Sequence, residues 1–232
     1  APDPATAIED RRLSGSFEES VARRVKFLAD YQDAAYAERY RALVARVADA
    51  ERARTPGRTG LAEAVARYAF KLMAYKDEYE VARLHTQPEF WRQLEATFDG
   101  RYKVKFNLAP PLFAKKDADG HLVKREYGPW MRRAFALLAK LKFLRGSALD
   151  PFGRSAERRM ERALVADYFA VADELVAGLD AGNHALALEI ASLPEQVRGY
   201  GHVKEAHLAR ALAQREALLV RWRAPEAQRI AA

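Results

Sequence analysis

The feature that most constrains the fold is the helical periodicity of the stretch from Leu61 to His85. Apolar residues recur there at alternating spacings of four and three, which places them on one face of an α-helix. Further apolar residues widen this face, so we expect a single helix that lies near the centre of the fold. Lys76 and Glu80 are four residues apart on it and can pair, although Lys on the N-terminal side is the weaker orientation. The residues of the face are Leu61, Val65, Tyr68, Leu72, Tyr75, Tyr79 and Ala82.

A longer helical pattern precedes this stretch. It runs from Phe17 to Arg54, but its apolar face changes phase near Gln32 and Asp33, which indicates a bend or two consecutive helices. Ser16 followed by Glu19 is typical of a helix N-terminal capping box. Further helices are expected at 88–98, 129–145, from Ser155 onward with Ser155 as the N-cap, around 186–190 and at 203–223.

The hydrophobic period changes from about 3.6 to two in one window only. Apolar and polar residues alternate from Tyr102 to Leu108, which is typical of a half-buried strand. The segments 112–116 and 121–127 flank the turn-forming sequence 117–120. The sequence therefore predicts a mainly α fold, in which a multi-helix domain holds one small antiparallel hairpin or three-stranded sheet. Residues 1–15 read as a linker or tether, and residues 16–232 as a single mostly helical domain.

Composition excludes several classes of protein. The chain has no cysteine, so it has no disulfide, no thiolate metal site and no cysteine-ligated iron–sulfur cluster. It carries 39 Lys and Arg against 32 Asp and Glu, but the two signs are interleaved, so nucleic acid is not expected as a partner. No apolar run is long enough to span a membrane, and no secretory signal is visible. We expect a cytoplasmic protein without a membrane partner.

Two stretches look like metal sites and fail on their chemistry. The segment 115–126 places Asp117, Asp119 and Glu126 where a calcium loop has ligands, but its first position is Lys115. His202 and His207 are five residues apart, which puts them on different sides of a helix. We expect no metal site and no catalytic residue in this chain, because it also lacks phosphate-loop, dinucleotide and serine-hydrolase motifs.

One stretch has the chemistry of an anion site. Gly153-Arg154-Ser155 opens a helix whose first backbone N–H groups are free, and further arginines follow on the next turns. The alternative is a surface ladder in which Glu157 and Glu161 neutralise these arginines. The candidate residues for binding a phosphate-bearing ligand such as coenzyme A are Gly153, Arg154, Ser155, Arg158, Arg159, Lys124 and Arg125.

Five strings of this sequence resemble the C-terminal region of bacterial fused indolepyruvate ferredoxin oxidoreductases. The similarity extends from Phe17 to about Arg223. The strings are YAFKLMAYKDEYEVARLH (68–85), FNLAPPL (106–112), REYGPWMRRAF (125–135), LRGSALDPFGRSAERRMERAL (144–164) and LPEQVRGYGHVKEAHL (193–208).

The resemblance implies a role within a larger enzyme. The complete enzymes of that family oxidatively decarboxylate aryl pyruvates to acyl-CoA with thiamine diphosphate, iron–sulfur clusters, coenzyme A and ferredoxin. This chain has no thiamine motif and no cysteine, so the resemblance implies a non-catalytic accessory domain that binds none of these cofactors itself. Its partners would be the other domains of the same oxidoreductase, and ferredoxin only indirectly. The alternative is a stand-alone helical anion-binding module for nucleic acid or a nucleotide.

Overall fold

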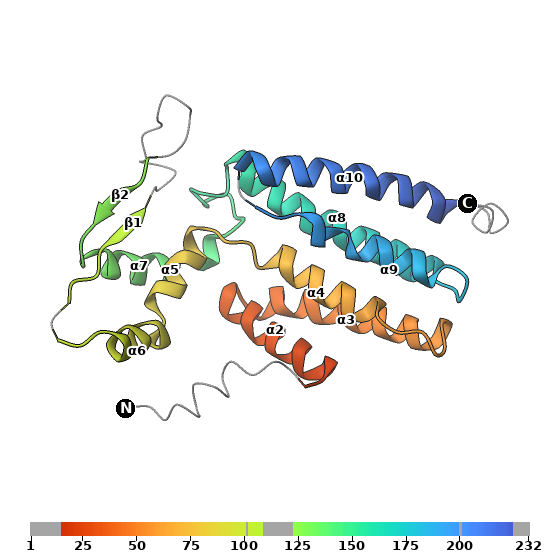
Figure 1. Cartoon of the computed structure of the whole chain (residues 1–232), viewed down its shortest axis with the longest axis horizontal. Coiled ribbons are helices and arrows are strands. Elements are labelled where there is room, and N and C mark those ends of the chain that lie inside the picture. The colour runs from red at the N-terminus through yellow and green to blue at the C-terminus, as the bar shows by residue number, and fades with distance from the viewer. Residues whose placement is uncertain (1–14, 101, 109–122, 200, 225–232) are drawn as a thin grey trace. The chain divides into compact units, whose positions relative to one another are not determined.

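The computed structural model of the chain describes residues 15–100, 102–108, 123–199 and 201–224 (Figure 1). Regular structure in these ranges is almost entirely helical, with one two-stranded antiparallel sheet, which confirms the predicted mainly α fold. Within the described ranges the chain forms two compact units. The first unit comprises residues 30–33 and 76–160, and the second comprises 15–29, 34–75 and 161–224. The expectation of a single folded domain from residue 16 stays a prediction.

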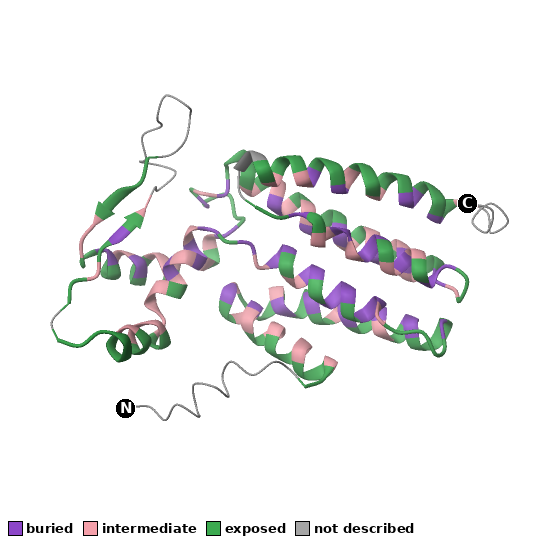
Figure 2. Cartoon of the chain, viewed as in Figure 1, coloured by how far each residue is buried: buried purple, intermediate pink, exposed green. Residues whose placement is uncertain are grey.

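The second unit is a set of packed helices around one apolar core. Its large buried side chains include Tyr40, Leu43, Val65 and Leu175, all almost without exposed surface (Figure 2). Helix α4 contacts both α3 and α9, so it lies at the centre of this core. The helices are α2 (Phe17–Tyr31), α3 (Ala34–Arg54), α4 (Leu61–Met73), α8 (Ala156–Gly178), α9 (His184–Ser192), the 3₁₀ turn η2 (Leu193–Gln196) and α10 (Gly201–Arg223); the ends of α2 and α8 extend into the first unit.

The predicted interruption of the first helical pattern is confirmed. Helix α2 ends at Tyr31 and α3 begins at Ala34, so the phase change marks two helices. The predicted cap is also present, because the Ser16 hydroxyl accepts a hydrogen bond from the backbone N–H of Glu19 at 3.1 Å. The Glu19 carboxylate reaches back to the N–H of Gly15, one residue before the position that a standard capping box uses.

The prediction of one continuous helix from Leu61 to His85 is wrong. Helix α4 ends at Met73, and a new helix, α5, runs from Glu78 to Thr86. Asp77 lies between them with an extended backbone (φ −113°, ψ −176°) and caps α5 through its side chain. All seven apolar residues of the predicted face are nevertheless buried. Periodicity therefore identified the buried residues correctly but not the break, because four non-helical residues preserved the phase.

The first unit holds a smaller apolar core and the sheet. Ala82, Phe106, Met131 and Phe135 form this core, and Phe106 pairs with Tyr127 across the sheet. The described strands are shorter than predicted, and the segment 109–122, with the expected turn and third strand, lies outside the described residues. The elements are α5, α6 (Pro88–Thr97), β1 (Phe106–Leu108), β2 (Arg125–Tyr127), α7 (Met131–Lys140) and the 3₁₀ turn η1 (Leu141–Leu144).

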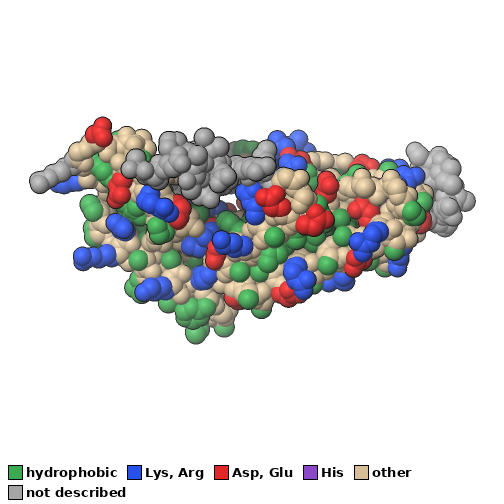
Figure 3. All heavy atoms as spheres, turned by 90° about the horizontal axis from the view of Figure 1, so that it is seen from below, with side chains coloured by type: hydrophobic (Ala, Val, Ile, Leu, Met, Phe, Trp, Pro, Cys, Tyr) green, Lys and Arg blue, Asp and Glu red, His purple; other side chains and the backbone are tan. Residues whose placement is uncertain are grey.

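Charged residues of both signs lie side by side on the face of the molecule that Figure 3 shows. Figure 3 shows Lys and Arg side chains beside Asp and Glu side chains over much of the visible face, as the interleaved sequence predicts. No helix in the described part of the chain is both long enough and apolar enough to cross a membrane.

Candidate functional site

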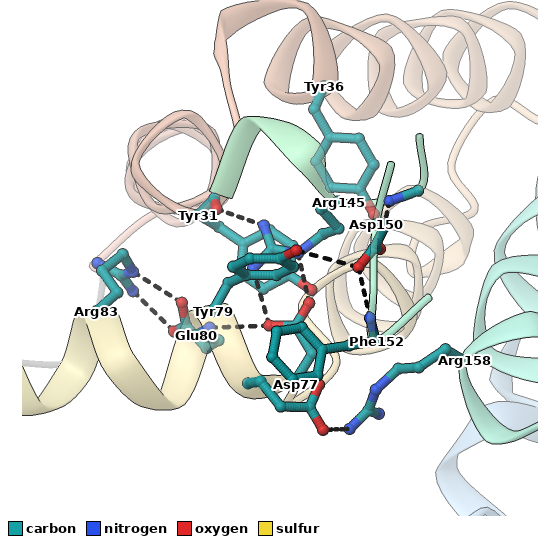
Figure 4. Close-up of polar contacts among 12 residues, drawn as sticks. Tyr31, Tyr36, Asp77, Tyr79, Glu80, Arg83, Arg145, Asp150, Phe152 and Arg158 are labelled. Carbon is teal, nitrogen blue, oxygen red and sulfur yellow. Dashed lines mark hydrogen bonds and ion pairs between the residues drawn. The ribbon is translucent and has the colours of Figure 1, made fainter. Parts of the chain in front are cut away.

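A buried polar cluster forms at the start of α5, in the first unit. We call it the Arg145 cluster, and Figure 4 shows its side chains converging from three parts of the chain. One part is the end of α2, another is the start of α5, and the third is the loop after η1. The residues of the Arg145 cluster are Tyr31, Asp77, Tyr79, Arg145 and Asp150.

Arg145 and Asp77 form a two-pronged ion pair inside the fold. Arg145 Nε donates to Asp77 Oδ2 at 2.6 Å, and a terminal guanidinium nitrogen donates to Asp77 Oδ1 at 2.9 Å. The other terminal nitrogen donates to the carbonyl oxygen of Tyr31 at 2.5 Å. Both side chains are almost completely buried. Such a pair is stable in a low-dielectric interior only when its remaining donors and acceptors are also satisfied, and here each guanidinium nitrogen has an acceptor.

Asp77 has a second role that explains why α5 begins where it does. Its Oδ1 accepts the backbone N–H of Glu80 at 2.8 Å, which satisfies one of the free donors at the start of the helix. A carboxylate at this position also interacts favourably with the helix dipole. The same carboxylate therefore fixes the start of α5 and holds Arg145.

Aromatic rings complete the surroundings of the guanidinium. The Arg145 guanidinium carbon lies 3.7 Å from the centroid of the Tyr31 ring, which is close enough for a cation–π interaction. The Tyr79 hydroxyl donates to Asp150 Oδ1 at 3.1 Å. Burial, followed by the negative charge of Asp150, raises the pKa of Tyr79 well above its ordinary value. Tyr79 therefore stays protonated and acts as a hydrogen-bond donor.

Asp150 organises the loop that carries Arg145. Its two carboxylate oxygens accept the backbone N–H groups of Phe152 at 3.0 Å and Gly146 at 2.8 Å. The Phe152 ring packs edge to face on the Tyr79 ring, with 5.4 Å between the centroids. The loop is therefore held in one conformation by a buried carboxylate and an aromatic contact.

The predicted anion-binding residues lie partly beside this cluster. Ser155 caps α8 as expected, because its hydroxyl accepts the N–H of Arg158 at 3.2 Å. The Arg158 side chain turns inward and lies 3.4 Å from a carboxylate oxygen of Glu78 (Figure 4). Burial alone would lower the pKa of Arg158, but the carboxylates of Glu78 and Glu157 outweigh it and raise the pKa. Arg158 is therefore already paired within the protein.

The other predicted residues at the start of α8 have different surroundings. Arg154 and Arg159 are exposed, and each donates to a backbone carbonyl oxygen, that of Ala148 for Arg154 and that of Arg154 for Arg159. Gly153 is buried. A carbonyl oxygen carries no net charge, so these two exposed guanidinium groups keep their positive charge available to solvent.

The seven residues predicted to bind an anion come from two separate parts of the chain. Lys124 lies just before β2, and Arg125 is its first residue and pairs with Leu108 across the sheet; both are exposed. The predicted ladder is also only partly formed. Glu157 lies 4.0 Å from Arg158, but Glu161 pairs with Lys204 in the second unit.

His85 and His184 contact residues of the fold. His85 stacks on Phe135 with 5.1 Å between the ring centroids, and its Nδ1 lies 2.7 Å from the Val81 carbonyl oxygen. His184 lies against Glu51 in the second unit. Within the described ranges, no group of three or more His, Asp or Glu side chains is arranged to hold a metal ion. The calcium-like residues Lys115 to Gly120 lie outside them.

The Arg145 cluster is the feature that sequence reasoning missed. Its ion pair joins residues 68 positions apart, so no local spacing could reveal it. The available signals were weaker, namely an Asp before a helical segment and an Arg-Gly after one. Chemically the cluster is closed, because its charged atoms already bind one another or the backbone, and it serves to hold α5 against the loop that leads to α8.

Comparison with known proteins identifies the family of this chain but no function. The model of a family of unknown function, DUF6537, matches residues 17–217. No curated protein and no solved structure matches the chain. Since the matched segment covers most of the sequence, this chain belongs to the DUF6537 family.

Proposed function

We propose that this chain is a non-catalytic accessory domain of an indolepyruvate ferredoxin oxidoreductase. In this proposal other domains carry out the oxidative decarboxylation of an aryl pyruvate to an acyl-CoA. Thiamine diphosphate, the iron–sulfur clusters and coenzyme A are bound there and not by this chain. The chain contributes to the assembly of those domains and to shielding of the substrate, in the cytoplasm.

The observation that carries the proposal is that two of the strings on which the resemblance rests contact each other in the folded chain. The string 68–85 supplies Asp77 and Tyr79, and the string 144–164 supplies Arg145 and Asp150. In the folded chain these four residues form most of the Arg145 cluster. The residues that mark the resemblance therefore maintain a fold, which is what a domain without its own chemistry requires.

The proposal predicts the cofactor content of the full-length gene product. Purified without oxygen, it is expected to contain thiamine diphosphate and iron–sulfur clusters, and to reduce an electron acceptor with indolepyruvate and coenzyme A. The chain 1–232 alone is expected to give no turnover above buffer, because this chemistry depends on the cofactors. Cofactor analysis, visible absorbance and steady-state assays measure these outcomes. A full-length product that lacks a thiamine site contradicts the proposal, and so does turnover by pure chain 1–232.

A second candidate is a stand-alone anion-binding module, and one observation favours it. Arg154 and Arg159 lie exposed beside the start of α8 and are tied to carbonyl oxygens, so they remain available to a phosphate group. Arg158 would contribute little, because it already faces Glu78.

This candidate predicts coenzyme A binding that depends on the two exposed arginines. Replacing Arg154 and Arg159 together with Gln is expected to weaken binding at least about tenfold, because each charge-assisted hydrogen bond contributes about 1.5–3 kcal/mol. Titration calorimetry measures the dissociation constant of coenzyme A for the wild type and the variant. The matched control is Lys26→Gln/Arg221→Gln, which removes two exposed charges in the second unit. Equal binding by the Arg154/Arg159 variant, or none by the wild type at millimolar ligand, excludes the site.

A further inference from the structure

An exposed row of alternating apolar and cationic side chains runs along α7 into η1. The spacings along this row are three, four, three and three residues, which place its members on one side of a helix. Its apolar members are unusually exposed for their size, at 60%, 64% and 68% for Trp130, Leu137 and Phe143. We call this row the α7 stripe, and its residues are Trp130, Arg133, Leu137, Lys140 and Phe143.

The stripe is not the core-facing side of α7. Met131 and Phe135 occupy that side and are buried, and α7 packs there on α5 within the first unit. Helix α7 therefore has two apolar faces, and only one of them is covered by the residues that the structure describes. Large exposed apolar side chains gathered on one element are typical of an interaction surface, whereas single exposed residues are ordinary.

The surroundings of the stripe are strongly cationic. From Val123 to Met160 ten residues are Lys or Arg and only three are Asp or Glu, so this segment carries as much net positive charge as the whole chain. Arg154 and Arg159 are exposed and donate to backbone carbonyl oxygens, which carry no net charge. Arg133 and Lys140 form no ion pair with any residue in the described ranges.

We propose that the α7 stripe docks onto an acidic protein surface in which carboxylates surround apolar pockets. This inference rests on the proposed function, which makes the occupant another domain of the same oxidoreductase. Trp and Arg are enriched in the centres of protein interfaces, and complementary charge selects the partner and fixes its register. The three apolar side chains would fill pockets, and Arg133 and Lys140 would meet carboxylates between them.

The arrangement favours a protein over other anionic partners. A helix that lies on a membrane turns its apolar face toward the lipid and its charged face toward water. In the α7 stripe the cations and the apolar residues share one face, because the opposite face is occupied by the core. Single-stranded nucleic acid binds through aromatic stacking, but Leu137 at the centre of the stripe offers no ring.

Photo-crosslinking in the full-length gene product tests the inference. Benzoylphenylalanine replaces Leu137, and in a separate control it replaces Val220, which is 69% exposed on α10. The expected result is a cross-link from position 137 to an acidic segment of another domain, identified by mass spectrometry, and none from position 220.

Adding Arg133→Glu/Lys140→Glu is expected to reduce the cross-link about tenfold, because like charges then face each other. The control Lys26→Glu/Arg221→Glu changes the net charge equally and is expected to leave the yield unchanged.

The outcomes separate this inference from the proposed function. A gene product that holds thiamine diphosphate but gives no cross-link from position 137 overturns the docking surface and leaves the proposed function standing. An acidic, charge-dependent partner domain in a polypeptide without a thiamine site supports the docking surface and overturns the proposed function. Binding of the gene product to phosphatidylserine vesicles or to oligonucleotides that disappears in the Glu variant overturns the choice of a protein partner. Circular dichroism melting of each variant confirms that the fold is retained.

Discussion

Replacing Arg145 with Ala is expected to lower the free energy of unfolding by about 3–5 kcal/mol. The change removes three hydrogen bonds and leaves the Asp77 carboxylate buried without its counter-ion. It also opens a space against the Tyr31 ring. The cost is large because water cannot reach the remaining charge, so the loss exceeds that of an exposed ion pair. Urea denaturation followed by circular dichroism measures it.

Two control variants test whether the loss of stability comes from the buried ion pair. One changes the geometry at Arg145 and the other removes a nearby exposed arginine. Arg145→Lys keeps the positive charge but cannot reproduce the planar fork, so its effect is expected to lie between those of wild type and Arg145→Ala. Arg154→Ala, in the same loop, removes an exposed guanidinium and is expected to change stability by less than about 0.5 kcal/mol. Hydrogen exchange is expected to accelerate first in residues 76–160, the unit that contains the cluster. Equal effects of Arg145→Ala and Arg154→Ala would contradict the structural role of the cluster.

Local features of the fold could be predicted from sequence where a single element determined them. The two caps, Ser16 and Ser155, depend on a hydroxyl and an N–H three residues apart, and both are formed. The phase change near Gln32 correctly marked the boundary between α2 and α3. The change of hydrophobic period located the sheet, because the alternation of buried and exposed residues in a strand differs from that of a helix.

Features that depend on distant partners could not be predicted in the same way. Asp77 lies inside an apparently continuous helical pattern, but its carboxylate caps α5 and also pairs with the distant Arg145. The helical spacing allowed a pair of Lys76 and Glu80, but Glu80 instead accepts two hydrogen bonds from Arg83, three residues on, at 2.7 and 2.8 Å. The break in the helix thus coincides with a tertiary ion pair that local sequence spacing does not reveal.

The same reasoning applies to the candidate anion site. The sequence grouped three arginines, Arg154, Arg158 and Arg159, near the start of α8 because they are close in the chain, together with Lys124 and Arg125 from the hairpin. Proximity in sequence could not show that Arg158 turns inward toward Glu78, a residue 80 positions away. Nor could it show that Arg154 and Arg159 stay exposed. The structure thus separates the predicted arginines: Arg158 is half-buried and paired with Glu78, whereas Arg154 and Arg159 are exposed and bonded only to carbonyl oxygens.

The second unit contains a comparable buried carboxylate, at Glu51. Helix α4 begins after Gly60, which has no side chain to cap it, so the first N–H groups need an acceptor from elsewhere. Glu51, on α3, supplies it, because its carboxylate accepts from the N–H of Leu61 at 2.8 Å and of Ala62 at 3.0 Å. The same carboxylate lies 2.7 Å from His184 Nε2 at the start of α9. One buried side chain thus joins three helices.

Replacing Glu51 with Ala is therefore expected to lower the free energy of unfolding by about 3–5 kcal/mol, because two backbone N–H groups and a buried imidazole lose their acceptor. For a chain of this size that corresponds to a fall in Tm of roughly 6–20 °C. Glu51→Gln keeps the shape and one acceptor but turns an amide N–H₂ toward a donor, so an intermediate loss is expected.

The matched control is Glu63→Ala, which removes an exposed carboxylate from the first turn of α4 and is expected to cost less than about 1 kcal/mol. Thermal melting compares the three variants. Equal Tm values for Glu51→Ala and Glu63→Ala would show that the start of α4 does not depend on the buried carboxylate.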